Sequence, residues 1–187
     1  MKLVQDDAAI LHATRHWLER AVIGLNLCPF AKSVHVKQQI RYVVSRATAD
    51  HDLLQDLEFE LLFLAAADPL RIDTTLLIAP EMLSDFFEFN DFVARAGRLL
   101  KKMRLTGILQ IASFHPLYQF GDQEPDDIEN YTNRSPYPIL HLLREESIER
   151  VLATFPDADS IYERNKETLR SLGGNGWRGW MDAGNND

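Results

Sequence analysis

The spacing of hydrophobic residues divides the chain into alternating helical and extended segments. From residue 6 to 26 apolar residues recur at helical spacing, with Ile10, Trp17 and Val22 on the buried side. Short β-branched or apolar runs farther along the chain are typical of strands. The predicted elements are helix 6–26, strand 39–47, helix 50–67, strand 74–80, helix 84–103, strand 108–114, and helices 137–153 and 157–172.

The order strand, helix, strand, helix, strand between residues 39 and 114 predicts an α/β (or α+β) fold. Strands joined by helices of this length normally run parallel, with right-handed crossovers. We therefore expect a small, mainly parallel sheet of about three strands in βαβαβ order. An N-terminal helix and two C-terminal helices are expected to flank this sheet.

The length of 187 residues suits one well-buried core rather than two domains. We expect a single globular domain at 1–172, followed by a flexible Gly- and Asn-rich tail at 173–187. Trp177 and Trp180 lie in this tail, and they can either dock back on the body or meet a partner.

Residues 114–145 form a long polar stretch between apolar segments. His115 directly follows the third predicted strand, and open α/β sheets bind ligands at the carboxyl ends of their strands. Because Pro116 turns the chain away from the sheet, we expect His115 at the rim of a pocket, acting as a general acid or base. The alternative is a strand-end histidine bonded to a nearby carbonyl group.

The other end of this stretch has the features of a helix start. Ser135 suits an N-cap and Pro136 a first-turn position, and the free N–H groups of such an end favour an anion. Arg134 beside them offers two donors to a carboxylate or phosphate. Because Pro136 and Pro138 remove donors, the anion clamp depends on Arg134, Asn133 and Ser135. Alternatively, Arg134 pairs with an acidic residue of the loop and pins it.

Other polar residues of the stretch complete the candidate site. His141, Arg144 and Glu145 would share one helix face, with His141 supporting catalysis, although a solvated face is the favoured alternative. Asn130 can orient a ligand or cap a turn, and Tyr118 can donate a hydrogen bond or simply pack. The expected ligand-binding residues are Arg134, Asn133, Ser135, Asn130, Tyr118 and Arg144.

The only cysteine, Cys28, is a candidate nucleophile beside His115 or His141. Its place at the C-terminal end of the first helix opposes a thiolate, so a buried, inert thiol is the favoured alternative. A metal site built from these three residues lacks a ligand pair at diagnostic spacing. His12 and His16 lack the glutamate of an H-E-x-x-H motif. We therefore predict no metal site.

The charge balance narrows the choice of partners. The net charge of -8, with scattered basic residues, argues against nucleic acid. No apolar run reaches the roughly 20 residues needed to span a bilayer, and the N-terminus lacks a signal-peptide pattern, so we expect no membrane contact and a cytoplasmic location. Common nucleotide and hydrolase motifs are absent. A small anionic molecule is the partner that the candidate residues favour.

Three stretches resemble a known bacterial family: GLNLCPFAKS at 24–33, FHPLYQF at 114–120 and NYTNRSPYPILHLLREESI at 130–148. The family is catalogued as domain of unknown function 1415, and the resemblance extends from the first helix to about residue 172. It implies a bacterial, cytoplasmic protein and supplies no catalytic residues. Three functions are considered: an enzyme acting on a small anionic metabolite, a non-catalytic ligand-binding or regulatory module, and a purely structural packed loop.

Overall fold

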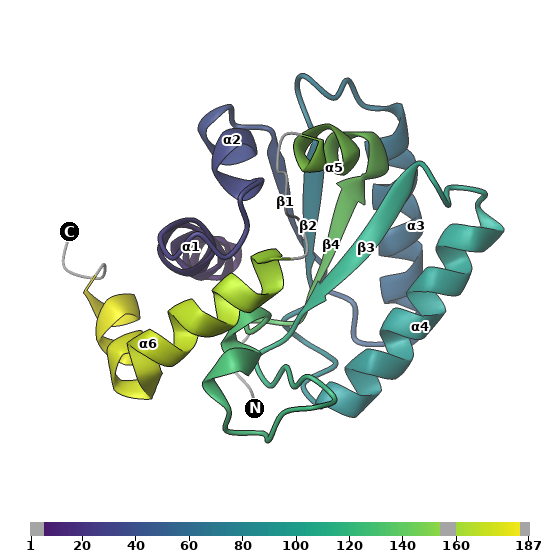
Figure 1. Ribbon diagram of the computed structural model, residues 1–187. Helices are drawn as coiled ribbons and strands as arrows, with labels where there is room; N and C mark the ends of the chain where they lie inside the picture. The colour runs from purple at the N-terminus through teal and green to yellow at the C-terminus, as the bar shows by residue number, and fades with distance from the viewer. Residues whose placement is uncertain (1–5, 154–159, 184–187) are drawn as a thin grey trace.

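The computed structural model describes residues 6–153 and 160–183 and has a mixed α/β fold, as predicted (Figure 1). A four-stranded sheet lies between two layers of helices. Its strands are β1 (Ile40–Val44), β2 (Thr74–Ile78), β3 (Leu109–Phe114) and β4 (Ile139–Arg144). The helices are α1 (Asp7–Trp17), the π-helical η1 (Leu18–Ile23), α2 (Ala31–Val36), α3 (Asp50–Ala66), α4 (Phe86–Lys102), the 3-10 helix η2 (Ile128–Thr132), α5 (Glu145–Leu152) and α6 (Ser160–Asp182).

The sheet differs from the predicted one because a fourth strand lies inside it. The strand order is β1-β2-β4-β3. β1 and β2 pair in parallel, whereas β4 is antiparallel to both β2 and β3. The three predicted strands therefore point the same way, but the expectation of a mainly parallel sheet is wrong. β4 takes the start of the predicted helix 137–153, because the short apolar run ILHLL fits a buried strand as well as a helix.

Each face of the sheet has its own hydrophobic core. Helices α3 and α4 cover one face, and α1, α2 and α6 lie over the other (Figure 1). Successive side chains of β2 alternate between the cores: Leu77 packs in the first, and Leu76 and Ile78 pack in the second. All five residues of β2 are buried, as expected for a strand covered on both sides.

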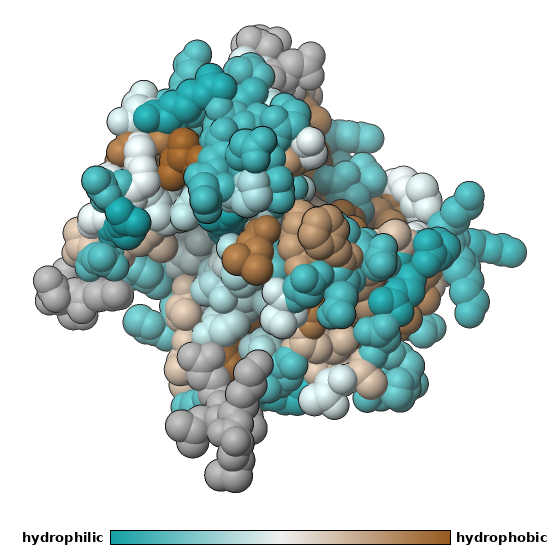
Figure 2. All heavy atoms as spheres, turned by 90° about the horizontal axis from the view of Figure 1, so that it is seen from below, coloured by the Kyte–Doolittle hydropathy of each residue, from teal (hydrophilic) through white to brown (hydrophobic). Residues whose placement is uncertain are grey.

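The segment between β3 and β4 lies at the lower end of the sheet in Figure 1, beyond the carboxyl ends of β1, β2 and β3. Its two ends meet: the His115 N–H donates to the Asn133 carbonyl at 3.2 Å, and the Ser135 N–H donates to the His115 carbonyl at 3.4 Å. No helix begins at Ser135, because the chain continues directly into β4. The predicted helix N-terminus for an anion is therefore wrong. Figure 2 shows this end of the molecule, with apolar surface near its middle.

The C-terminal segment continues α6 instead of fraying. Helix α6 extends to Asp182 and is kinked at Gly173, whose φ of 65° lies in the region that favours glycine. Beyond the kink, Trp177 is buried, and Trp180 Nε1 donates to the Arg20 carbonyl at 2.8 Å. The expected flexible tail is therefore wrong for residues 173–182, and both tryptophans dock on the body. No described helix is long and apolar enough to cross a membrane.

Candidate functional site

His115 is completely buried, not placed at a pocket rim as expected. Its Nε2–H donates to the Leu83 carbonyl at 2.8 Å, and its Nδ1 accepts the N–H of Leu117 at 3.0 Å. The rings of Phe86 and Phe89 pack on it, and burial lowers its pKa. Both ring nitrogens therefore have backbone partners, which leaves neither free for proton transfer. This geometry matches the structural alternative for His115.

The two asparagines of the loop also hold its backbone. Asn130 is fully buried; its Oδ1 accepts the Phe120 N–H at 3.0 Å, and its Nδ2 donates to the Glu124 carbonyl at 2.7 Å. Asn133 Nδ2 donates to the Ser113 carbonyl at 3.4 Å. These side chains act as internal turn caps. They are thereby committed to the loop itself.

Arg134 pins the loop through carbonyl groups. Its Nε donates to the Tyr118 carbonyl at 3.2 Å and its Nη2 to the Pro125 carbonyl at 2.5 Å. Its guanidinium also lies 4.5 Å from the ring centre of Tyr131. Among the described residues, no carboxylate forms an ion pair with it, so the loop is pinned without the predicted acidic partner. Arg134 stands at the edge of a cleft.

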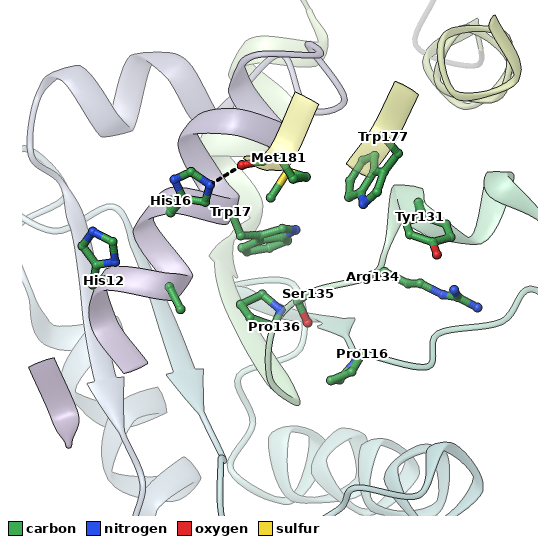
Figure 3. Close-up of a pocket in the computed structure, with 11 residues that line it drawn as sticks. His12, His16, Trp17, Pro116, Tyr131, Arg134, Ser135, Pro136, Trp177 and Met181 are labelled. Atoms are coloured by element: carbon green, nitrogen blue, oxygen red, sulfur yellow. Dashed lines mark hydrogen bonds between the residues drawn. The ribbon is translucent and has the colours of Figure 1, made fainter. Parts of the chain in front are cut away.

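This cleft opens between α1, the loop and the outer part of α6, and it has a volume of about 570 Å³ (Figure 3). Its walls are mainly aromatic: Trp17 comes from α1, Tyr131 from η2 and Trp177 from α6. The rings of Tyr131 and Trp177 meet edge to face, with centroids 4.9 Å apart. The cleft therefore exists only because the residues expected to form a tail are folded against the loop.

The polar side chains of the cleft are His12, His16, Arg134 and Ser135, and none of its described lining residues is acidic. His12 and His16 lie one turn apart on α1 with their rings stacked at 6.5 Å. His16 Nε2 also bonds the Met181 carbonyl at 2.9 Å, as Figure 3 shows. The sequence marks this histidine pair only as a candidate for metal binding. Within the described ranges, no three histidine, cysteine or acidic side chains gather to hold a metal ion.

A second, narrower cavity of about 80 Å³ brings together two predicted catalytic residues, Cys28 and His141. It lies on the face of the sheet that α1 and α2 cover, with Phe114 and Thr74 also in its wall. His115 is on the opposite face, against the rings of α4. The three predicted catalytic residues therefore do not meet. Cys28 and His141 share a cavity, and His115 lies apart from them.

Both groups in this cavity favour their neutral forms. Burial lowers the pKa of His141 to about 4. Burial also raises the pKa of the Cys28 thiol, which the N–H groups of Phe30 and Ala31 offset only in part. A neutral thiol is a poor nucleophile. These properties therefore match the alternative in which Cys28 is a buried, inert thiol.

Acid is expected to destabilise the fold through His141. The unfolded chain protonates this residue at its ordinary pKa of 6.5, and the folded chain only at about 4. The free energy of unfolding therefore has its full value above pH 6.5. It falls by on the order of 3 kcal/mol as the pH drops toward 4, because the unfolded chain takes up a proton that the folded chain does not. Urea unfolding at several pH values should show a flatter pH dependence for His141→Leu than for the unaltered protein.

The matched control for this prediction is His51→Leu, because the His51 side chain is 75% exposed. It should leave the pH dependence unchanged. Equal pH dependence in His141→Leu and the unaltered protein would contradict the assignment. His115, whose pKa is also lowered, contributes equally to all three proteins.

Arg144 lies on β4 and not on a helix face with His141, so that prediction is wrong. Alternation along the strand directs the two side chains to opposite faces of the sheet. Its Nη2 donates to the carbonyls of Leu64, Ala67 and Ile72 at 2.6, 2.7 and 3.2 Å. Arg144 therefore ties β4 to the end of α3, far from the cleft.

Comparison with known proteins identifies one family. The family model described as protein of unknown function (DUF1415) matches residues 9–179. This range includes the Cys28–His141 cavity and the lining of the cleft except Met181. Neither curated proteins nor solved structures give a match.

Proposed function

Because the chain belongs to the DUF1415 family, whose description assigns no activity, we propose a function from the geometry of the cleft: the protein binds a small molecule with a flat, apolar body and an anionic group. One observation carries this proposal. A cleft with three aromatic walls and no acidic lining residue among those described opens in a chain of net charge -8.

The aromatic walls suit a flat ligand. Ligand pockets typically measure about 300–1,000 Å³ and are mainly apolar, with a few polar groups that orient the ligand. Here Trp17 and Trp177 offer ring surfaces from two different helices, and Tyr131 stands beside Trp177. Each favourable contact between aromatic rings contributes about 0.5–1.5 kcal/mol beyond the burial of area.

The charge of the lining favours an anion over a cation. Asp and Glu make up 28 of the 187 residues, yet neither occurs in the described lining, whose ionisable groups are one arginine, two histidines and the Tyr131 phenol. The guanidinium of Arg134 points away from the tryptophans in Figure 3, toward the outer edge of the cleft. An anionic group at that edge would lie on the Arg134 side, with the apolar body between the rings.

Catalysis by His115, one of the three functions considered from the sequence, gains no support from this geometry. An acid or base must reach the proton that it transfers, whereas His115 is sealed and bonded at both nitrogens. The non-catalytic binding module is the alternative that the cleft favours. A ligand-binding role needs no group of the cleft to change its protonation state.

The test uses three probes of one shape: 2-naphthoate, 2-naphthamide and 2-naphthylmethylamine, which are anionic, neutral and cationic. Calorimetry should give affinities in the order anion, amide, cation. Ala13→Leu should weaken binding, because Ala13 lines the cleft and the larger leucine side chain narrows it without breaking the helix. Ala9→Leu is the matched control, since Ala9 is exposed on the same helix outside this lining.

Three outcomes would contradict the proposal. If no probe binds at millimolar concentration, the cleft is not a site for flat molecules. If Ala13→Leu and Ala9→Leu bind equally well, the probes bind elsewhere on the surface. An amine that binds more tightly than the acid would refute the anion preference.

A further inference from the structure

The cavity that contains Cys28 and His141 is separate from the cleft. Trp17 contributes to the lining of both, and its side chain is only 4% exposed. The ring of Trp17 meets Phe114 edge to face, with centroids 5.1 Å apart. The closely packed pair of Trp17 and Phe114 therefore lies where the cleft and the inner cavity adjoin. A ligand bound in the cleft would not occupy the inner cavity.

The inner cavity is mainly apolar, and most of its polar groups already have partners. Asp73 Oδ1 accepts the Ser147 hydroxyl at 2.6 Å, and the Thr74 hydroxyl donates to the Leu142 carbonyl at 2.6 Å. The remaining lining near His141 comes from side chains such as Phe114 and Leu143. The hydrogen-bonding capacity left for a ligand is therefore on His141, on the second carboxylate oxygen of Asp73 and, weakly, on the Cys28 thiol.

The hydrogen bonds around Thr74 determine the tautomer of His141. A threonine hydroxyl has one proton, and here it goes to the Leu142 carbonyl. The 2.7 Å contact between Thr74 Oγ1 and His141 Nε2 must then have Nε2–H as the donor. A neutral ring protonated at Nε2 carries a lone pair on Nδ1. Among the described residues this nitrogen has no hydrogen-bond partner.

We propose that this cavity binds a small, mainly apolar molecule that donates one hydrogen bond, from a hydroxyl or N–H group, to Nδ1 of His141. The apolar wall contacts the body of such a ligand, and the Nδ1 acceptor orients it. An anionic ligand is disfavoured, because it would lose its hydration beside the Asp73 carboxylate in the same wall. The ligand class therefore differs from the anion proposed for the cleft.

The volume limits the size of the ligand. At about 80 Å³, the cavity is about half as large as the roughly 150 Å³ apolar cavity that binds benzene. A molecule of about three or four heavy atoms fits this space, such as a three-carbon alcohol. Cys28 lies half-buried in the same wall and is the only cysteine of the chain, so alkylation of the thiol is alkylation of this residue.

The experiment measures the rate at which iodoacetamide alkylates Cys28 with increasing propan-2-ol or acetone. Both molecules have the same size, but only the alcohol donates a hydrogen bond. Propan-2-ol should slow alkylation with an apparent affinity roughly threefold to tenfold better than that of acetone, the range expected for one neutral hydrogen bond. In His141→Leu the two should slow alkylation equally.

Two further measurements make the result decisive. Ala13→Leu, which narrows the cleft, should leave the protection of Cys28 intact, so failure of the cleft proposal would not affect this one. In the unaltered protein, the ¹⁵N resonance of His141 Nδ1 should move upfield with propan-2-ol and not with acetone. Protection by neither molecule, or equal protection by both in the unaltered protein, would overturn the proposal.

Discussion

Replacing Arg144 with alanine is expected to lower the free energy of unfolding by about 3–5 kcal/mol. A hydrogen bond to a charged group contributes about 1.5–3 kcal/mol, and leaving a buried acceptor without a partner costs about 1–3 kcal/mol. Arg144 supplies the Nη2 donor for three carbonyls, and its side chain is only 10% exposed. Two of these carbonyls belong to the C-terminal end of α3, where a positive charge also complements the helix dipole.

Urea unfolding measures this change directly, and Arg150→Ala is the matched control. Arg150 lies six residues away with its side chain 63% exposed, and it pairs with Glu146 on the surface of α5. Such a pair contributes about 0.3–0.5 kcal/mol. Arg144→Lys should recover only part of the loss, because an ammonium group lacks the fixed fork of the guanidinium. A loss below about 1 kcal/mol for Arg144→Ala would refute the tie between β4 and α3.

Trp177→Ala is expected to release the segment of α6 beyond Gly173 from the body. Truncating a buried aromatic side chain typically costs about 3–5 kcal/mol, and Trp177 is 9% exposed against Tyr131. The global loss is limited, because the segment can undock while the sheet stays folded. Hydrogen exchange of the amides in 174–182 should therefore accelerate about a hundredfold or more, since each 1.4 kcal/mol corresponds to tenfold.

Several contacts of this segment remain in the variant and limit the size of the effect, among them the hydrogen bond from Trp180 Nε1 to the Arg20 carbonyl. Arg20 Nη2 donates to the Trp180 carbonyl at 2.6 Å, and His16 bonds the Met181 carbonyl. The control is Arg178→Ala, because Arg178 is exposed on the same segment and bonds only the nearby Asn175 side chain among described residues. Fast exchange of 174–182 in the unaltered protein, or slow exchange in Trp177→Ala, would contradict the docked segment.

Local patterns in the sequence were sufficient for the elements between residues 39 and 114. The helix 84–103 has a clear start, and in the structure Asp85 caps α4 by accepting the N–H groups of Phe87 and Glu88. The three strands of this region also appear in order. Each of these elements is determined by its own periodicity and end residues, which do not depend on distant parts of the chain.

The fourth strand depends on information that a local pattern does not contain. The run ILHLL is apolar at nearly every position, so it has neither a clear helical nor a clear strand period. It becomes a strand because the crossover from β2 through α4 to β3 leaves a gap one strand wide, which β4 fills. Two expectations about the candidate site are wrong for the same reason. The helix start at Ser135 and the shared helix face for His141 and Arg144 both require a helix where the structure has β4.

The candidate site was located only in part from the sequence. The prominent loop does border the cleft, through Arg134 and Ser135, and Cys28 and His141 do share a cavity. The side on which His115 is buried depends on α4 packing over β3, which no residue of the loop reveals. Trp177 was placed in a tail because glycine and asparagine around it indicate loops, although Gly173 in fact permits the kink that brings the segment back.

The position of β4 inside the sheet has a consequence for synthesis on the ribosome. When residues 1–138 have emerged, β2 and β3 are complete but still lack the strand that joins them. Until residues 139–144 follow, β2 and β3 each present an unpaired edge toward the gap. Exposed strand edges are sites of intermolecular pairing. A nascent or truncated chain that ends before β4 is thus exposed to aggregation in a way that the finished protein is not.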